Sequence, residues 1–91
     1  MLEEFDVARR LERHPGWTAR ANALRREFEF PTFEDAIKFV GRVAVEAEAM
    51  DHHPDIDVRY RRVILTLNTH SVGGITDLDF DLAARVDRVA E

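Results

Sequence analysis

The pattern of hydrophobic and polar residues begins with a short helix. Phe5, Ala8 and Leu11 recur every three positions among acids and arginines between residues 3 and 13, which is typical of an amphipathic helix. The sequence His-Pro-Gly at residues 14–16 favours a turn and should end this helix. The three apolar residues would form the buried side of the helix.

Residues 17–30 alternate apolar with charged side chains. Trp17 and Ala19 lie on one parity of the alternation, and Phe28 and Phe30 lie on the other. A period of two is the signature of a half-buried β-strand. We therefore expect two strands in this segment, joined by a turn near residues 22–25.

A longer helix is predicted to follow Pro31 and to run to about Met50. Thr32 can cap its N-terminus with Asp35 at the third helical position, and Glu34 in the first turn favours the positive end of the helix dipole. Apolar residues recur every three or four positions and should pack against a sheet. This stripe consists of Phe33, Ile37, Val40, Ala44 and Ala47, widened by Ala36, Val43 and Met50.

A second pair of strands is predicted after this helix. Pro54 biases the residue before it toward extended geometry, so a corner between helix and strand should form there. Apolar and polar side chains alternate over residues 56–60 and again over residues 63–68. We expect these two strands to be antiparallel and joined tightly around Arg61 and Arg62.

A final helix completes the pattern. After a flexible Ser-Val-Gly-Gly turn at residues 71–74, Thr76 and Asp79 repeat the capping arrangement of the long helix. The apolar residues of this helix are Leu78, Leu82, Val86 and Val89. The order helix, strand, strand, helix, strand, strand, helix predicts a single α+β domain over residues 1–91, with a four-stranded antiparallel sheet and three helices on one face.

Composition restricts the classes of function. The formal net charge is −5 and the arginines are scattered among acids, so we expect no nucleic-acid partner. The absence of cysteine excludes disulfides, thiolate metal sites and thiol nucleophiles. The first residues do not resemble a secretion signal, and no run approaches the roughly 18 apolar residues of a membrane span. We expect a cytoplasmic protein with no membrane partner.

Three of the four histidines lie where functional side chains are commonly displayed. His52 and His53 stand at the corner after the long helix, and His70 stands at the end of a strand. Imidazole can donate and accept protons near neutral pH. Glu48 precedes His52 by four residues and would share its helix face if the helix extends far enough. With Asp79 near a helix N-terminus, these residues are a candidate acid/base cluster with orienting carboxylates.

Simpler explanations exist for each of these residues. A pair of adjacent histidines is often a surface feature, and a histidine at a strand end often only forms hydrogen bonds. Asp79 can serve only as a helix cap, and Glu48 only as a solvated helical acid. Three histidines with a carboxylate could also bind zinc with an open position, although adjacent histidines rarely point toward the same ion.

These histidines belong to a longer motif. Its members, in chain order, are Glu48, His52, His53, Pro54, Tyr60, His70 and Asp79. This order of residue types resembles the signature of the pterin-4a-carbinolamine dehydratase family, and the resemblance covers nearly the whole chain. One departure is Arg61, where the family usually carries Asn. Because Asn adopts left-handed turn geometry more readily than Arg, this departure bears on how tightly the hairpin turns.

The resemblance implies a dehydratase that converts the 4a-hydroxytetrahydropterin left by an aromatic amino-acid hydroxylase into a quinonoid dihydropterin. It implies that the catalytic residues are His52, His53 and His70, with Glu48 and Asp79 as supporting acids. It implies that the residues in contact with the pterin are His52, His53, Pro54, Thr69, His70 and Ser71. Neither a metal nor a cofactor is implied, since the pterin is the substrate. Relatives form homodimers or homotetramers by joining sheet edges and packing helices, which suits a small domain with an open sheet edge.

The implied chemistry needs one acid and one base. Hydroxide leaves C4a readily only if its oxygen is protonated, while N5 must lose a proton. We predict that His52 protonates the leaving hydroxyl, that His53 orients the pterin, and that His70 is a second acid/base. Two other functions stay open: a protein-binding role as a dimerisation cofactor, and a pterin enzyme of another pathway such as molybdopterin metabolism.

Overall fold

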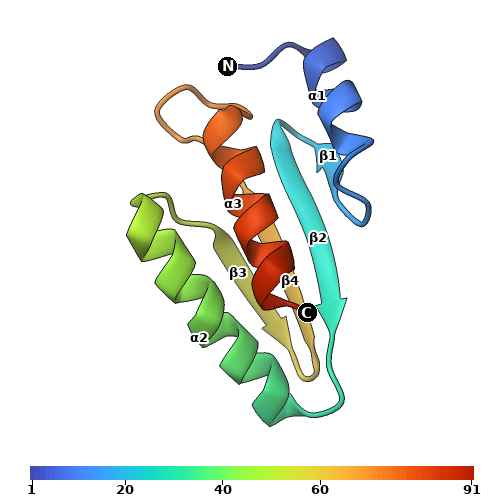
Figure 1. Cartoon of the computed structure of the whole chain (residues 1–91), viewed down its shortest axis with the longest axis vertical. Coiled ribbons are helices and arrows are strands. Elements are labelled where there is room, and N and C mark those ends of the chain that lie inside the picture. The colour runs from blue at the N-terminus through green and yellow to red at the C-terminus, as the bar shows by residue number, and fades with distance from the viewer.

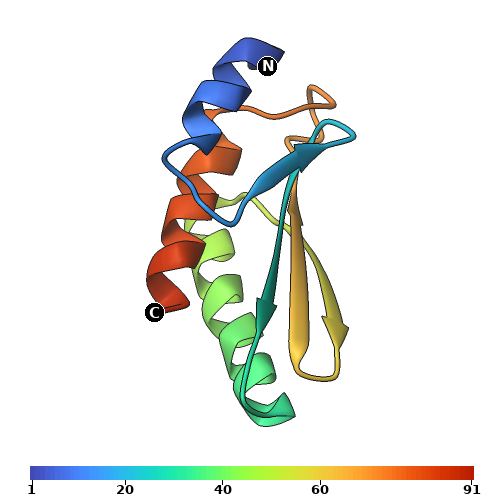
Figure 2. The same ribbon diagram turned by 90° about the vertical axis from the view of Figure 1, so that its right-hand side faces the viewer.

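The elements predicted from the sequence form two layers, a sheet and three helices packed on one of its faces (Figures 1 and 2). The computed structural model describes residues 1–91. In chain order the elements are α1 (Glu4–Leu11), β1 (Thr18–Arg20), β2 (Ala23–Glu29), α2 (Phe33–Met50), β3 (Asp55–Arg59), β4 (Arg62–Leu67) and α3 (Asp77–Val89). The predicted order and fold class are confirmed. No helix has both the length and the apolar character needed to cross a membrane.

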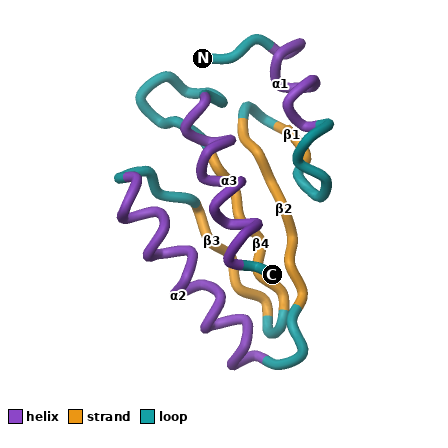
Figure 3. The backbone as a smooth tube through the Cα atoms, viewed as in Figure 1, coloured by secondary structure: helices purple, strands orange, loops and turns teal.

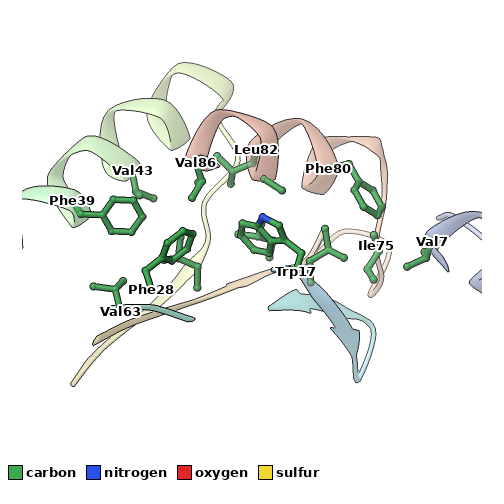
Figure 4. Close-up of a cluster of buried hydrophobic side chains, with 14 of the residues drawn as sticks. Val7, Trp17, Phe28, Phe39, Val43, Val63, Ile75, Phe80, Leu82 and Val86 are labelled. Atoms are coloured by element: carbon green, nitrogen blue, oxygen red, sulfur yellow. The ribbon is translucent and has the colours of Figure 1, made fainter. Parts of the chain in front are cut away.

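All strand pairs are antiparallel, and the strands lie in the order β1-β2-β4-β3 (Figure 3). The hydrophobic core lies between this sheet and the helices (Figure 4). Phe39 of α2 is fully buried, and its ring centroid lies 4.8 Å from those of Phe28 and Phe30. These contacts hold α2 against the end of the sheet at which β2 finishes.

Helix α2 has the predicted limits, but its buried face differs from the predicted one. The backbone N–H of Asp35 donates to the hydroxyl of Thr32 at 3.0 Å, which confirms the cap. The buried residues of α2 are Ala36, Phe39, Val43 and Ala47. Three residues predicted to pack are exposed instead: Phe33, Ile37 and Ala44. The apolar stripe is wide enough for two orientations, and the one observed buries the Phe39 ring, which the predicted stripe omits.

Helix α1 also packs through a different side. Val7 is its only buried residue, and Leu11, one turn later, is partly buried against the core. The predicted face is therefore wrong for Phe5 and Ala8, which are exposed. Spacing by three and spacing by four both suit a helix, and in an eight-residue helix the pattern is too short to separate them.

Both hairpins turn at other residues than predicted. The first turn is formed by Ala21 and Asn22 rather than by the predicted residues 22–25. Ala21 and Asn22 have positive φ angles of 53° and 63°, as tight two-residue turns require. The second is formed by Tyr60 and Arg61, not by Arg61 and Arg62. Here Tyr60 takes the positive φ of 54°, so this hairpin is tight despite the Arg at position 61.

Candidate active site

The two histidine segments lie side by side at one end of the sheet (Figure 1). Strands β3 and β4 are antiparallel, with Asp55 opposite Thr66, so the corner before β3 meets the loop after β4. An open cleft of about 400 Å³ lies between the two segments. Its lining residues are Asp51, His52, His53, Pro54, Asp55, Thr69, His70, Ser71 and Leu78. All six residues expected to contact the substrate are among them.

The corner begins where α2 ends. Asp51 has left-handed geometry with φ of 50°, and the N–H of His52 donates to the carbonyl of Ala47 at 3.0 Å. This arrangement satisfies the last carbonyls of the helix and turns the chain out of the helical path. His52 consequently points inward and is only 9% exposed, whereas His53 is exposed.

Glu48 pairs with His53 rather than with His52. The carboxylate of Glu48 and the Nε2 atom of His53 form a hydrogen bond at the surface. The helix does not extend far enough for Glu48 and His52 to share a helix face, because it ends before His52 and the left-handed residue Asp51 redirects the chain.

The partner of His52 is Asp79. The Nε2 atom of His52 lies 2.7 Å from Oδ1 of Asp79, whose side chain is fully buried in the first turn of α3. The other carboxylate oxygen accepts the backbone N–H of Thr76 at 2.9 Å, which completes the predicted cap of α3. Asp79 therefore serves as a helix cap and as the partner of a histidine at the same time. The bond to Asp79 uses Nε2, one of the two ring nitrogens of His52.

The loop after β4 closes on Thr69. Its N–H donates to the carbonyl of Gly74 at 2.9 Å, and its carbonyl accepts the N–H of Gly73 at 3.0 Å. Gly73 has a φ of 66°, which glycine adopts without a steric cost. His70 and Ser71 stand exposed at the tip of this turn, beside the cleft.

Three residues of the cleft are absent from the predicted site: Asp51, Asp55 and Leu78. The two aspartates flank the His-His-Pro segment, so their position in the sequence could have indicated them. Leu78 has the spacing of the buried face of α3 but is 43% exposed. The motif residue Tyr60 lies at the far end of β3 from the cleft. At about 3.3 Å per residue along a strand, it is roughly 16 Å from Asp55, which lines the cleft.

The charged groups of the site are arranged as histidine–carboxylate pairs. Asp79 binds His52 inside the protein, and Glu48 binds His53 at its surface. No three His, Asp or Glu side chains are grouped so that they could hold a metal ion. Fold and site together define a small α+β protein with two imidazole–carboxylate pairs at an open cleft.

The chain is similar to known proteins over nearly its whole length. The family model described as pterin 4 alpha carbinolamine dehydratase matches residues 1–89. A Roseiflexus castenholzii protein named "Putative pterin-4-alpha-carbinolamine dehydratase" is 48% identical over 89 residues, covering 98% of this chain and 96% of that protein. A Sulfolobus acidocaldarius protein of the same name is 42% identical over 88 residues, covering 97% of both. This chain belongs to the pterin-4a-carbinolamine dehydratase family.

Solved structures agree with this assignment. A protein described as a transcriptional coactivator/pterin dehydratase from Brucella melitensis has a TM-score of 0.95 and 36% identity, covering 99% of this chain and 98% of that one. A pterin dehydratase-like protein described as a RuBisCO assembly factor in the alpha-carboxysome has a TM-score of 0.67 and 24% identity, covering 81% and 86%, and shares the fold. The chain is an enzyme of the pterin-4a-carbinolamine dehydratase type.

Proposed function

We propose that this enzyme removes water from a 4a-hydroxytetrahydropterin by histidine acid/base catalysis, without a metal, and thereby serves tetrahydropterin recycling. The observation that carries the proposal is the bond between His52 and the buried carboxylate of Asp79, with His52 lining the cleft beside His53 and His70. A histidine held in this way has a defined ring orientation and one free nitrogen, as a proton-transfer group requires.

The reaction breaks the C4a–O bond and forms a C4a=N5 double bond. In the proposed mechanism, the protonated ring of His52 gives its Nδ1 proton to the hydroxyl, which leaves as water. The carboxylate of Asp79 stabilises the ring while it carries the proton, and in the neutral ring it keeps the remaining proton on Nε2. A base then removes the N5 proton, so the overall change is the loss of one water molecule. Each positioned group contributes on the order of 10²–10⁴-fold to the rate.

The other two histidines have different surroundings, which supports different roles. His53 is exposed and bonded to Glu48, so its ring is held at the mouth of the cleft and can orient the pterin. His70 stands on the opposite side of the cleft, at the tip of the turn closed by Thr69. We assign His70 as the second acid/base, which accepts the proton from N5.

A stopped-flow ultraviolet assay of 4a-hydroxytetrahydropterin dehydration tests the proposal. We expect the wild type to exceed the uncatalysed rate and the double variant His52→Ala, His53→Ala to lose this acceleration. His14→Ala is the matched control, because the His14 ring packs 5.4 Å from that of Phe80, outside the cleft. The role assignment would be wrong if His52→Ala and His70→Ala each kept wild-type turnover. No acceleration by folded wild-type protein would instead indicate a protein-binding role.

We also propose that two copies of this chain associate through β3. This strand is an open edge of the sheet, and such edges readily pair with another strand. Antiparallel self-pairing centred on Val58 would place Asp57 opposite Arg59 of the second copy. Within one chain, Arg59 donates to Asp57 at 2.9 Å, and this bond and the charge of Asp57 raise the pKa of Arg59. The two side chains therefore project from the same face of β3 and can exchange partners across the edge.

Size-exclusion chromatography with light scattering measures this association. We expect a dimer or tetramer of the 10.5 kDa chain at micromolar concentration. Asp57→Arg should weaken it by placing like charges opposite each other, and the double variant Asp57→Arg, Arg59→Asp should restore it. A wild type that is monomeric under these conditions would contradict the proposal.

A further inference from the structure

Thr69 lies between the two histidine segments and uses all of its polar groups inside the chain. It is only 8% exposed. Its hydroxyl lies 2.9 Å from Oδ2 of Asp79 and 2.7 Å from the hydroxyl of Thr76. Its backbone N–H and carbonyl close the turn that carries His70. Each polar group of Thr69 thus already has a partner inside the chain, although the residue borders the cleft.

The direction of these hydrogen bonds follows from the chemistry of the groups. An ionised carboxylate only accepts hydrogen bonds, so the single hydroxyl proton of Thr69 points to Asp79. The hydroxyl of Thr76 must then donate to Thr69, and it accepts in turn the backbone N–H of Leu78 at 3.2 Å. Donation therefore runs in one direction, from the first turn of α3 through two hydroxyls to Asp79.

The hydrogen bonds of Asp79 also determine which nitrogen of His52 carries a hydrogen. Oδ2 of Asp79 is occupied by two donors, the hydroxyl of Thr69 and the N–H of Thr76, which leaves Oδ1 for His52. Because Oδ1 accepts, the Nε2 atom of His52 must carry a hydrogen. The neutral ring is thereby held in one tautomer, with Nδ1 as its only basic nitrogen.

We infer that the side chain of Thr69 is a positioning group of the dehydratase site. Through Asp79 it holds the orientation and tautomer of the His52 ring, and through its backbone it holds the loop that carries His70. The kinetic part of this inference rests on the proposed function. Its structural part concerns the free protein and can be measured without substrate.

Thr69→Val separates positioning from substrate binding. The substitution keeps the shape of the side chain, removes one of the two donors to Oδ2 of Asp79 and leaves the Thr76 hydroxyl without its acceptor. We expect kcat to fall by up to about 10²-fold, the effect of a misplaced catalytic group, with KM nearly unchanged. Thr69→Ser retains the hydroxyl and should restore kcat. A raised KM with unchanged kcat would show that Thr69 binds the substrate and would overturn the inference.

Long-range ¹H–¹⁵N spectra of the histidine rings test the structural part. In the wild type and in Thr69→Ser, we expect the neutral His52 ring to show a protonated Nε2 and a bare Nδ1. In Thr69→Val, both resonances should move toward an averaged value. Thr66→Val, on the outer face of β4, is the matched control and should leave them unchanged. Unchanged His52 resonances in Thr69→Val would refute the positioning role.

The dehydration assay and the ring resonances test the proposed function and the role of Thr69 separately. If the wild type does not dehydrate the pterin, the proposed function is wrong, and the ring resonances still decide the role of Thr69. If Thr69→Val does not fold, as judged by far-ultraviolet circular dichroism, Thr76→Val replaces it. That variant removes the donor to Thr69 and should shift the His52 resonances in the same direction by a smaller amount. Their constancy there would equally overturn the inference.

Discussion

Asp79 has no contact with solvent, yet it is the residue on which both the capped start of α3 and the orientation of His52 depend. A buried carboxylate without partners would cost several kcal/mol. Here its two oxygens accept hydrogen bonds from His52, Thr69 and the N–H of Thr76, which offset the loss of hydration. Removing the side chain of His52, Thr69 or Asp79 would therefore leave a hydrogen-bonding partner unpaired.

Asp79→Asn should therefore impair catalysis more than its small change in shape suggests. An amide has one accepting oxygen, so it can serve His52 or the donors on the other side, but not both. We expect a loss of kcat on the order of 10²–10⁴-fold, measured by stopped flow. Asp81→Asn, at an exposed position of α3, is the control and should keep full activity. Wild-type turnover of Asp79→Asn would exclude a role for the carboxylate in proton transfer.

Helix α2 depends on its cap because its first turn lies at the periphery of the core. The hydroxyl of Thr32 accepts the N–H of Asp35, and no other side chain caps this end. Thr32→Ala should lower the free energy of unfolding by about 1 kcal/mol in urea denaturation. Thr32→Ser keeps the acceptor and should stay close to the wild type. Equal stability of the Ala and wild-type proteins would show that the cap contributes little.

The hairpin between β3 and β4 contains a local strain. Tyr60 has a φ of 54° although it carries a side chain, and that side chain is 71% exposed. Tyr60→Gly should raise the free energy of unfolding by roughly 1 kcal/mol, because glycine adopts this geometry without the steric cost. Arg61→Gly, one residue later, should be destabilising, since Arg61 has no positive φ and donates to the carbonyl of Phe30. Urea denaturation of both variants decides the sign.

The face of α2 that packs against the sheet contributes to the stability of the whole molecule. A chain of this length has a total stability of about 5–14 kcal/mol. Phe39→Ala would empty a fully buried site and should cost about 3–5 kcal/mol, a large part of that total. Phe33→Ala on the same helix is the control, since Phe33 is 51% exposed, and should cost far less. Thermal unfolding of both variants at low protein concentration measures the difference.

Polar contacts between residues far apart in the sequence join α3 to β2 and to the segment before β1. The indole N–H of Trp17 and the guanidinium group of Arg26 both donate to Asp87 of α3, at 2.9 and 2.8 Å. Trp17 and Asp87 are 70 positions apart in the sequence. No local pattern indicates such a pair, because it exists only once the segment before β1 and α3 face each other across the core.

The sequence by itself determined the number, type and order of the elements and the caps at Thr32 and Thr76. These features depend on residues within one or two turns of each other, so their signals are local. Tertiary structure alone decided which side of α2 is buried and which carboxylate serves which histidine. Glu48 does not pair with His52, because the chain leaves the helix at Asp51. Asp79, 27 positions from His52, pairs with it instead, because α3 packs beside that corner.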